Sequence, residues 1–203
     1  MNIKICGITN KEDALYISQF DVWSLGFIFY SKSPRYIEPE KAREIIDLLP
    51  KNIKKIGVFV NSIKEEMLKV KEISGIDIFQ LHGEETPELC ESLNTPFIKA
   101  FRLRDYSDLE NIKEYSNLKN LYAIIIDSFS NNAYGGTGLK ANWSLAKEVK
   151  QFGKVILAGG INSSNAKDAI SEVKPFALDL SSSVEIEAGI KDHKKIEEFF
   201  ESV

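Results

Sequence analysis

The sequence is short of cysteine, of arginine and of long apolar runs, and each shortage excludes a class of protein. Its two cysteines, Cys6 and Cys90, are too few for a disulfide framework, and no Cys-x-x-Cys pair indicates zinc or redox exchange. The most apolar stretch, residues 22–30, is interrupted by Ser24 and Gly26 and is far shorter than the about 20 residues that span a bilayer. We therefore expect no membrane segment, no metal site and a reducing, cytoplasmic location.

The charge balance excludes further partners. There are 26 Lys and Arg residues against 30 Asp and Glu residues, a net charge of -4, with no long basic run. Nucleic acids and anionic membranes require concentrated Lys and Arg, so we expect neither as a partner. Residues 1–6 lack the apolar core and the cleavage site of a secretory signal, so export is not expected. A chain of 203 residues suits one domain, residues 1–203, with a continuous core.

Eight apolar runs rich in β-branched residues alternate with eight amphipathic windows. Near-continuous apolarity is typical of strands covered on both faces, which favours a parallel sheet flanked by helices. Eight such units in 203 residues leave about 25 residues each, the low end for a strand and a helix. The pattern predicts a single-domain α/β protein, a (β/α)8 TIM barrel of minimal length. The predicted strands are 3–6, 22–27, 55–60, 76–80, 97–101, 123–127, 155–158 and 176–179.

The alternative fold is a doubly wound open sheet. That fold more often has five or six strands and a phosphate loop directly after the first strand, whereas residues 7–9 here read Gly-Ile-Thr. Helix starts are predicted from Pro39 and Pro87, which suit first helical turns, and from three capping-box spacings. These are Thr9 with Glu12, Ser62 with Glu65, and Ser107 with Glu110.

Two strand ends carry candidate catalytic groups, because barrels place their chemistry at the C-terminal ends of the strands. Cys6 ends the first strand and is either a small buried apolar residue or a thiol at the barrel mouth. Asp127 ends a fully apolar run, where desolvation would raise its pKa toward that of a general acid; the alternative is a cap on the next loop. Asp179 has the same placement, and a structural role is favoured for it. Cys90 falls in a helical window and is expected to be buried.

Other strand ends carry candidate binding groups. Gly159-Gly160 and residues 181–183, all serine, follow the seventh and eighth strands, where barrels often bind phosphate through backbone N–H groups. Arg35 is one of only four arginines against 22 lysines, which favours planar, bidentate recognition; the alternative is an ordinary surface arginine. His82 either donates to a ligand or stabilises its loop. We expect a small phosphorylated substrate.

Residues 134–138, Tyr-Gly-Gly-Thr-Gly, form a glycine-rich loop after Asp127. A loose dinucleotide fingerprint begins there, but it starts too far beyond the strand and has no acidic residue after the next strand. Ala141 after Lys140 excludes a nucleotide P-loop. We interpret the loop as covering the substrate or as irregular, and expect no cofactor.

The constellation resembles one family, phosphoribosylanthranilate isomerase of tryptophan biosynthesis. The matching segments are 4–9 (Lys-Ile-Cys-Gly-Ile-Thr), 26–27, 33–37, 57–61, 80–83, 127 with 134–138, 157–162, 179–182 and 191–192. The resemblance implies a cofactor-free, metal-free Amadori rearrangement of N-(5-phosphoribosyl)anthranilate, an aldose-ketose isomerisation. It makes Asp127 the general acid that opens the furanose ring and Cys6 the general base at the sugar C2.

The same resemblance assigns the binding residues. Arg35 would face the anthranilate carboxylate. His82 and Asp179 are further candidates for substrate binding from their positions at strand ends. The phosphate would lie at Gly159, Gly160, Ser181 and Ser182. The family usually has Gly where Ser183 stands. If that position needs positive φ or a close approach of the phosphate, Ser183 would weaken phosphate binding. It commonly has Pro-Gly where Ala188-Gly189 stands, which we expect to be a minor loop change.

Three alternatives stay open on the sequence. A histidine-pathway sugar isomerase typically has Asp at the first strand end, so Cys6 counts against it, and a pentose-phosphate epimerase is a second enzyme of the same general kind. A catalytically silent phosphate-binding barrel is the third, and the presence of both Cys6 and Asp127 counts against it. We expect a monomer, with a homodimer as the alternative.

Overall fold

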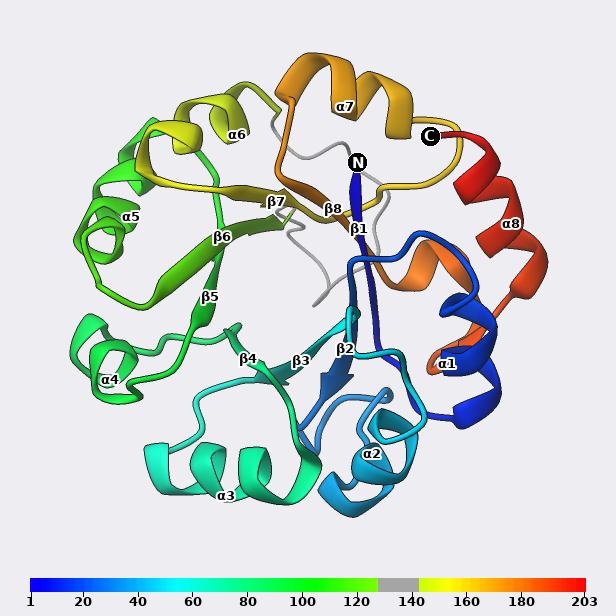
Figure 1. Cartoon of the computed structure of the whole chain (residues 1–203). Coiled ribbons are helices and arrows are strands. Elements are labelled where there is room, and N and C mark those ends of the chain that lie inside the picture. The colour runs from blue at the N-terminus through cyan, green and yellow to red at the C-terminus, as the bar shows by residue number, and fades with distance from the viewer. Residues whose placement is uncertain (128–142) are drawn as a thin grey trace.

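The computed structural model describes residues 1–127 and 143–203 as a closed barrel of eight parallel strands inside a ring of helices (Figure 1). This confirms the predicted fold. The barrel strands, in chain order and in spatial order, are β1 (Asn2–Cys6), β2 (Ser24–Ile28), β3 (Lys54–Phe59), β4 (Ile78–Leu81), β5 (Phe97–Arg102), β6 (Leu121–Asp127), β7 (Val155–Leu157) and β8 (Ala177–Leu180).

The helices lie outside the barrel, each between consecutive strands except the last (Figure 1). They are α1 (Lys11–Ile17), α2 (Pro39–Ile46), α3 (Lys64–Ser74), α4 (Pro87–Ser92), α5 (Leu109–Ser116), α6 (Trp143–Val149), α7 (Ala166–Val173) and α8 (His193–Glu201). Short 3-10 turns are η1 (Tyr106–Asp108), η2 (Lys150–Phe152) and η3 (Ser182–Val184). Among the described residues, no helix is both long and apolar enough to cross a membrane.

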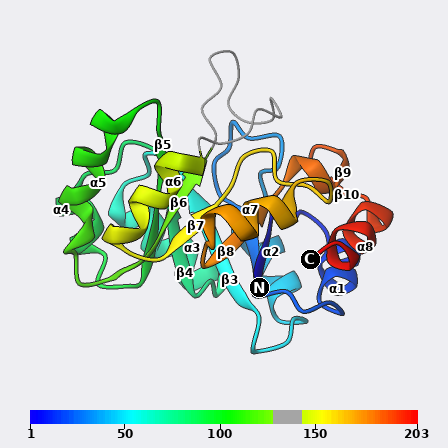
Figure 2. The same ribbon diagram turned by 90° about the horizontal axis from the view of Figure 1, so that it is seen from above.

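Between β8 and α8 the chain forms a small antiparallel hairpin of β9 (Glu185–Glu187) and β10 (Ile190–Lys191). Figure 2 shows this hairpin beside α8, on the side of the barrel where α1 also lies. It is an addition to the repeating strand-helix pattern, and the apolar runs of the sequence did not predict it.

Side chains alternate along each barrel strand between the helices and the interior. Outward residues such as Ile5 and Phe79 are fully buried and join the core cluster that includes the helix residues. Inward residues such as Ile56, Ile98 and Ile125 form a second buried cluster, which contains no helix residue. Burying an aliphatic or aromatic side chain fully is worth about 1.5–3 kcal/mol, so these two clusters supply the main stabilisation.

Three aromatic rings lie at the N-terminal end of the barrel interior. The rings of Trp23 and Phe176 meet edge to face at 5.2 Å, and Tyr122 stacks on Trp23 at 5.9 Å. Each of the three residues stands at the start of its strand or just before it. These rings lie at the end of the barrel opposite Cys6 and Asp127, which stand at the C-terminal ends of their strands.

The predicted strand positions are confirmed, but β2 and β4 each begin two residues later than expected and β6 begins two residues earlier. Pro39 and Pro87 are confirmed as first residues of α2 and α4.

The three capping-box spacings mark the starts of α1, α3 and α5, but the capping residues predicted from them are wrong. Asn10, not Thr9, caps α1 and accepts from the Asp13 backbone N–H, while the Thr9 hydroxyl donates to the Gly189 carbonyl. Helix α3 follows Ile63 with no side-chain cap, and Asp105 caps the 3-10 turn before α5.

Candidate functional site

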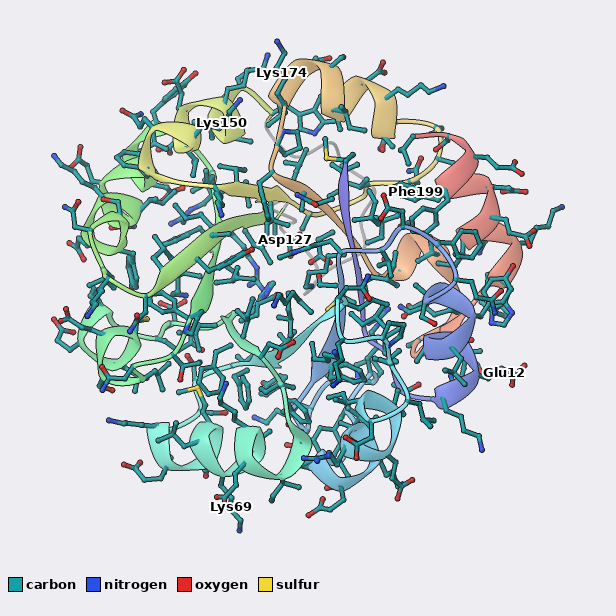
Figure 3. The ribbon with its side chains drawn as sticks, in the orientation of Figure 1. Glu12, Lys69, Asp127, Lys150, Lys174 and Phe199 are labelled. Carbon is teal, nitrogen blue, oxygen red and sulfur yellow. The ribbon has the colours of Figure 1, made fainter. Side chains whose placement is uncertain are left out.

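The strand ends meet around one cavity of about 500 Å³ at the C-terminal mouth of the barrel. Figure 3 shows Asp127 near the middle of the ring, whereas Glu12, Lys69, Lys150 and Lys174 point outward from it. All nine residues proposed from the sequence as site residues line this cavity. They are Cys6, Arg35, His82, Asp127, Gly159, Gly160, Asp179, Ser181 and Ser182.

Cys6 lies on the inward face of β1 and is only 6% exposed. A Cβ atom on the paired Gly26 of β2 would stand 2.8 Å from the Cys6 Sγ, so only glycine leaves the thiol its space. Burial raises the pKa of the Cys6 thiol, and the nearby ammonium groups of Lys4 and Lys191 oppose that rise. Cys6 is therefore a thiol with two cations close enough to stabilise its thiolate.

Lys4 lies on the same inward face of β1 two residues before Cys6, and the sequence reasoning missed it. Its side chain is fully buried, and its Nζ donates to both Asp179 carboxylate oxygens at 2.9 Å. Burial alone would lower the pKa of Lys4, but the attraction of Asp179 and Cys6 outweighs it and raises the pKa. The signal was a lysine between two isoleucines in a buried strand, which requires an anionic partner inside the barrel.

Asp179 pairs with Lys4 and also lines the cavity, so both the structural role and the substrate-binding role stay predictions for it. Strands β1 and β8 pair where the barrel closes, and their register sets Lys4 opposite Asp179. The two charges therefore meet between the first and last strands.

Asp127 and His82 face each other across the mouth. The Asp127 side chain is 19% exposed, and the His82 Nε2 lies 3.5 Å from its Oδ2. The Gln80 side-chain amide lies 3.0 Å from the His82 Nδ1. With that amide as donor, the neutral imidazole carries its proton on Nε2, the nitrogen that faces Asp127. His82 is thus placed to hydrogen-bond the carboxyl group.

Gln80 is a cavity residue that the sequence reasoning did not single out. It is 1% exposed, and its Oε1 has no hydrogen-bond partner among the described residues. Its place on the inward face of β4, two residues before His82, was the available signal.

Arg35 reaches the cavity from the loop between β2 and α2. Its guanidinium is bound by the carboxylate of Glu185 in β9, and Glu185 is also paired with Lys191 in β10. The sequence reasoning missed both hairpin residues as site residues, although the resemblance included the segment 191–192.

The opposite side of the cavity is built from glycine and serine. Gly159 and Gly160 have φ of +79° and +71°, a conformation that turns the chain sharply after β7. The Asn162 and Asn165 side-chain amides donate to the Gly160 carbonyl at 3.1 and 2.9 Å and hold this turn.

Ser183 lies in η3 and is not among the described residues with positive φ, so the first of the two conditions is not met, while the effect of a close phosphate approach stays a prediction. The predicted glycine-rich loop, Tyr134–Gly138, lies outside the described residues. Within residues 1–127 and 143–203, no group of three or more His, Cys, Asp or Glu side chains could hold a metal ion.

Known proteins are similar to this chain over almost its whole length. A family model described as N-(5'phosphoribosyl)anthranilate (PRA) isomerase matches residues 3–202. The N-(5'-phosphoribosyl)anthranilate isomerase of Geotalea uraniireducens is 43% identical over 197 residues, which cover 97% of this chain and 95% of that protein.

Two solved structures are similar over the whole chain. Phosphoribosyl anthranilate isomerase from Thermotoga maritima has a TM-score of 0.92 and 38% identity, covering 100% of this chain and 98% of the other. A phosphoribosyl anthranilate isomerase in complex with reduced 1-(o-carboxyphenylamino)-1-deoxyribulose 5-phosphate has a TM-score of 0.88 and 38% identity, covering 100% and 97%.

Proposed function

The chain belongs to the N-(5'-phosphoribosyl)anthranilate isomerase family and is an isomerase of tryptophan biosynthesis, and on this premise we propose that Cys6 and Asp127 are the base and acid of its reaction. The observation that carries the proposal is that both groups, from β1 and β6, face one cavity of about 500 Å³. A volume of this size suits a ligand with one aromatic ring, one pentose and one phosphate.

Asp127 acts first, as the general acid. Its protonated carboxyl donates to the furanose ring oxygen while the bond between that oxygen and C1 breaks, and the anilino nitrogen supplies the electron pair for the new C=N bond. The product of this step is an open-chain iminium ion. His82, with Nε2 3.5 Å from the Asp127 Oδ2, orients the carboxyl.

Cys6 acts second, as the general base. Its thiolate removes the proton from C2, and the electrons of that C–H bond neutralise the iminium nitrogen, which gives an enol. Tautomerisation of the enol yields the ketose, so atoms and electrons balance without an external oxidant. Lys4 and Lys191 favour the thiolate against the rise in pKa that burial causes. The two groups have different environments, as an acid/base pair requires.

The remaining cavity residues bind the ends of the substrate. We assign the phosphate to Gly159, Gly160, Ser181 and Ser182, because the positive φ of the two glycines lets backbone approach the phosphate oxygens. Arg35 binds the anthranilate carboxylate through a charge-assisted contact. His82 and Asp179 face the sugar between these ends.

The direct test is isomerase activity, followed as loss of fluorescence of freshly generated phosphoribosylanthranilate. We expect Cys6→Ser and Asp127→Asn each to lower kcat by about 100-fold or more, the scale of acid/base contributions. Cys90→Ser is the matched control, since this thiol is buried away from the cavity. Turnover near that of the unmodified enzyme in either variant would refute its assigned role.

Two further proposals concern the cellular location and the oligomeric state of the protein. We place it in the cytoplasm, because both described cysteines are free thiols and Cys6 must remain reduced to act as base. We propose a monomer, because a single barrel of this size buries a continuous core of its own. Sedimentation distinguishes this from a homodimer.

A further inference from the structure

Arg35 is held from behind by Glu185. The Arg35 Nε lies 2.9 and 3.0 Å from the two Glu185 carboxylate oxygens, and its Nη2 lies 2.6 Å from Oε2. Arg35 lines the cavity and its side chain is 22% exposed, whereas Glu185 is 3% exposed and is not among the described lining residues. The pair is bidentate, which fixes the plane of the guanidinium and not only its position.

The aliphatic part of Arg35 is fixed as well. A Cβ atom at Gly7 would stand 2.7 Å from the Arg35 Cδ, so the side chain lies directly on the Gly7 backbone. Gly7 has φ of +81°, a conformation that favours glycine. Because Gly7 directly follows Cys6, the backbone next to the proposed base also supports the arginine.

Glu185 has a second cationic partner, Lys191. The Lys191 Nζ lies 2.8 Å from the Glu185 Oε1 and 2.6 Å from the Cys6 carbonyl oxygen, with the Ser181 carbonyl at 3.5 Å. The Lys191 side chain is fully buried, and these three acceptors match the three N–H donors of an ammonium group. Lys191 therefore ties the hairpin to the strand end that carries Cys6.

We propose that Glu185 and Lys191 are positioning residues for the substrate: Glu185 sets the plane of the Arg35 guanidinium, and Lys191 leaves this three-residue cluster with one net positive charge. A carboxylate paired with Arg35 alone would neutralise it and weaken its attraction for an anionic substrate group. The second cation removes that conflict, so that Arg35 is both oriented and electrostatically attractive. The inference rests on the proposed binding of the anthranilate carboxylate by Arg35.

The ionisation of Glu185 agrees with this arrangement. Burial would raise the pKa of Glu185, but the hydrogen bonds and charges of Arg35 and Lys191 outweigh burial and lower it. The carboxylate is therefore ionised at neutral pH. Burial lowers the pKa of Lys191, and the attraction of Glu185 opposes that fall.

The test is a double-mutant cycle on kcat and KM, using Arg35→Ala, Glu185→Gln and the two together. We expect Glu185→Gln to raise KM about tenfold with kcat changed less than about twofold, as for loss of a charge-assisted contact. In the Arg35→Ala background the same substitution should change KM by less than about twofold, because Glu185 acts through Arg35. Glu187→Gln, in the same hairpin but exposed, is the matched control.

Lys191→Met supplies an independent reading. It removes the net positive charge of the cluster while Glu185 still holds Arg35, so KM should rise and lose much of its dependence on salt concentration. It should also lower kcat, because Lys191 favours the Cys6 thiolate. If Glu185→Gln does not fold, Glu185→Gln with Lys191→Met removes both buried charges together and should restore folding while KM stays raised.

The outcomes separate the two proposals. If Arg35→Ala leaves KM unchanged, the proposed role of Arg35 fails, and this inference fails with it. If Arg35→Ala raises KM but Glu185→Gln behaves like Glu187→Gln, only the positioning role is overturned. An equal rise in KM from Glu185→Gln with and without Arg35 also overturns it, since Glu185 would then act by another route.

Discussion

Replacing Lys4 by Met should weaken both the fold and the reactivity of Cys6. Lys4 is fully buried and donates to both oxygens of Asp179, whose side chain is only 9% exposed. Methionine fills a similar volume but leaves the Asp179 carboxylate without that cation. Breaking a buried pair in this way costs about 3–5 kcal/mol, a large share of the about 5–15 kcal/mol that stabilises a typical domain.

Urea denaturation at neutral pH measures the loss of stability. We expect Lys4→Met to lower the free energy of unfolding by the amount above, and the double variant with Asp179→Asn to recover part of it, because no buried charge is then left unpaired. A loss of less than about 1 kcal/mol in Lys4→Met would be typical of a solvent-exposed salt bridge. It would contradict the expected cost of breaking a buried one.

Alkylation by iodoacetamide measures the effect on Cys6, because the thiolate is the reactive form. The Lys4 ammonium opposes the rise in the pKa of Cys6, so Lys4→Met should raise that pKa further and move the alkylation profile to higher pH. Cys90 is an internal reference, since burial raises its pKa to about 11, and peptide mass spectrometry separates the two thiols. An unchanged Cys6 profile would refute a role for Lys4 in stabilising the thiolate.

Two further predictions concern groups away from the cavity. Burial raises the pKa of Cys90 from 9.0 to about 11, so the thiol of the unfolded chain ionises first as pH rises. The free energy of unfolding should therefore fall by about 2 kcal/mol between pH 9 and 11 through this group. Cys90→Ala should not show this fall. The Lys99 Nζ lies 3.2 Å from the buried Glu85 Oε2 and 2.7 Å from the Gly83 carbonyl oxygen. Lys99→Met should therefore lower the free energy of unfolding in urea by about 3–5 kcal/mol. Adding Glu85→Gln should recover part of that cost, and a double variant no more stable than Lys99→Met would contradict the pairing.

Positions at strand ends were predictable because they depend on local pattern and one rule of topology. Cys6 and Asp127 each end an apolar run, and a closed parallel barrel brings all such ends to one rim. The two groups are separated by most of the barrel sequence, yet the strand pattern was enough to place both at one cavity. Their assignment as base and acid came from the resemblance to a known family.

Contacts between distant segments were not predictable in the same way. The Lys4–Asp179 pair joins residues 175 positions apart, and the Arg35–Glu185 pair joins residues 150 positions apart. No periodicity links residues at such distances, so neither Glu185 nor Lys191 stood out as part of the site. The capping-box predictions failed for a related reason at Thr9, where a tertiary hydrogen bond to Gly189 takes the hydroxyl that local spacing assigned to the helix.

The sequence by itself determined the barrel and the residues at its mouth, because alternation along a strand and the order of strands and helices are properties of neighbouring residues. The tertiary structure decided the electrostatics. Only chain closure brings Lys4 against Asp179, and only the hairpin after β8 brings Glu185 and Lys191 against Arg35 and Cys6. Charges act through space, and in a buried site their effect depends on separations of a few ångströms that the order of residues does not specify.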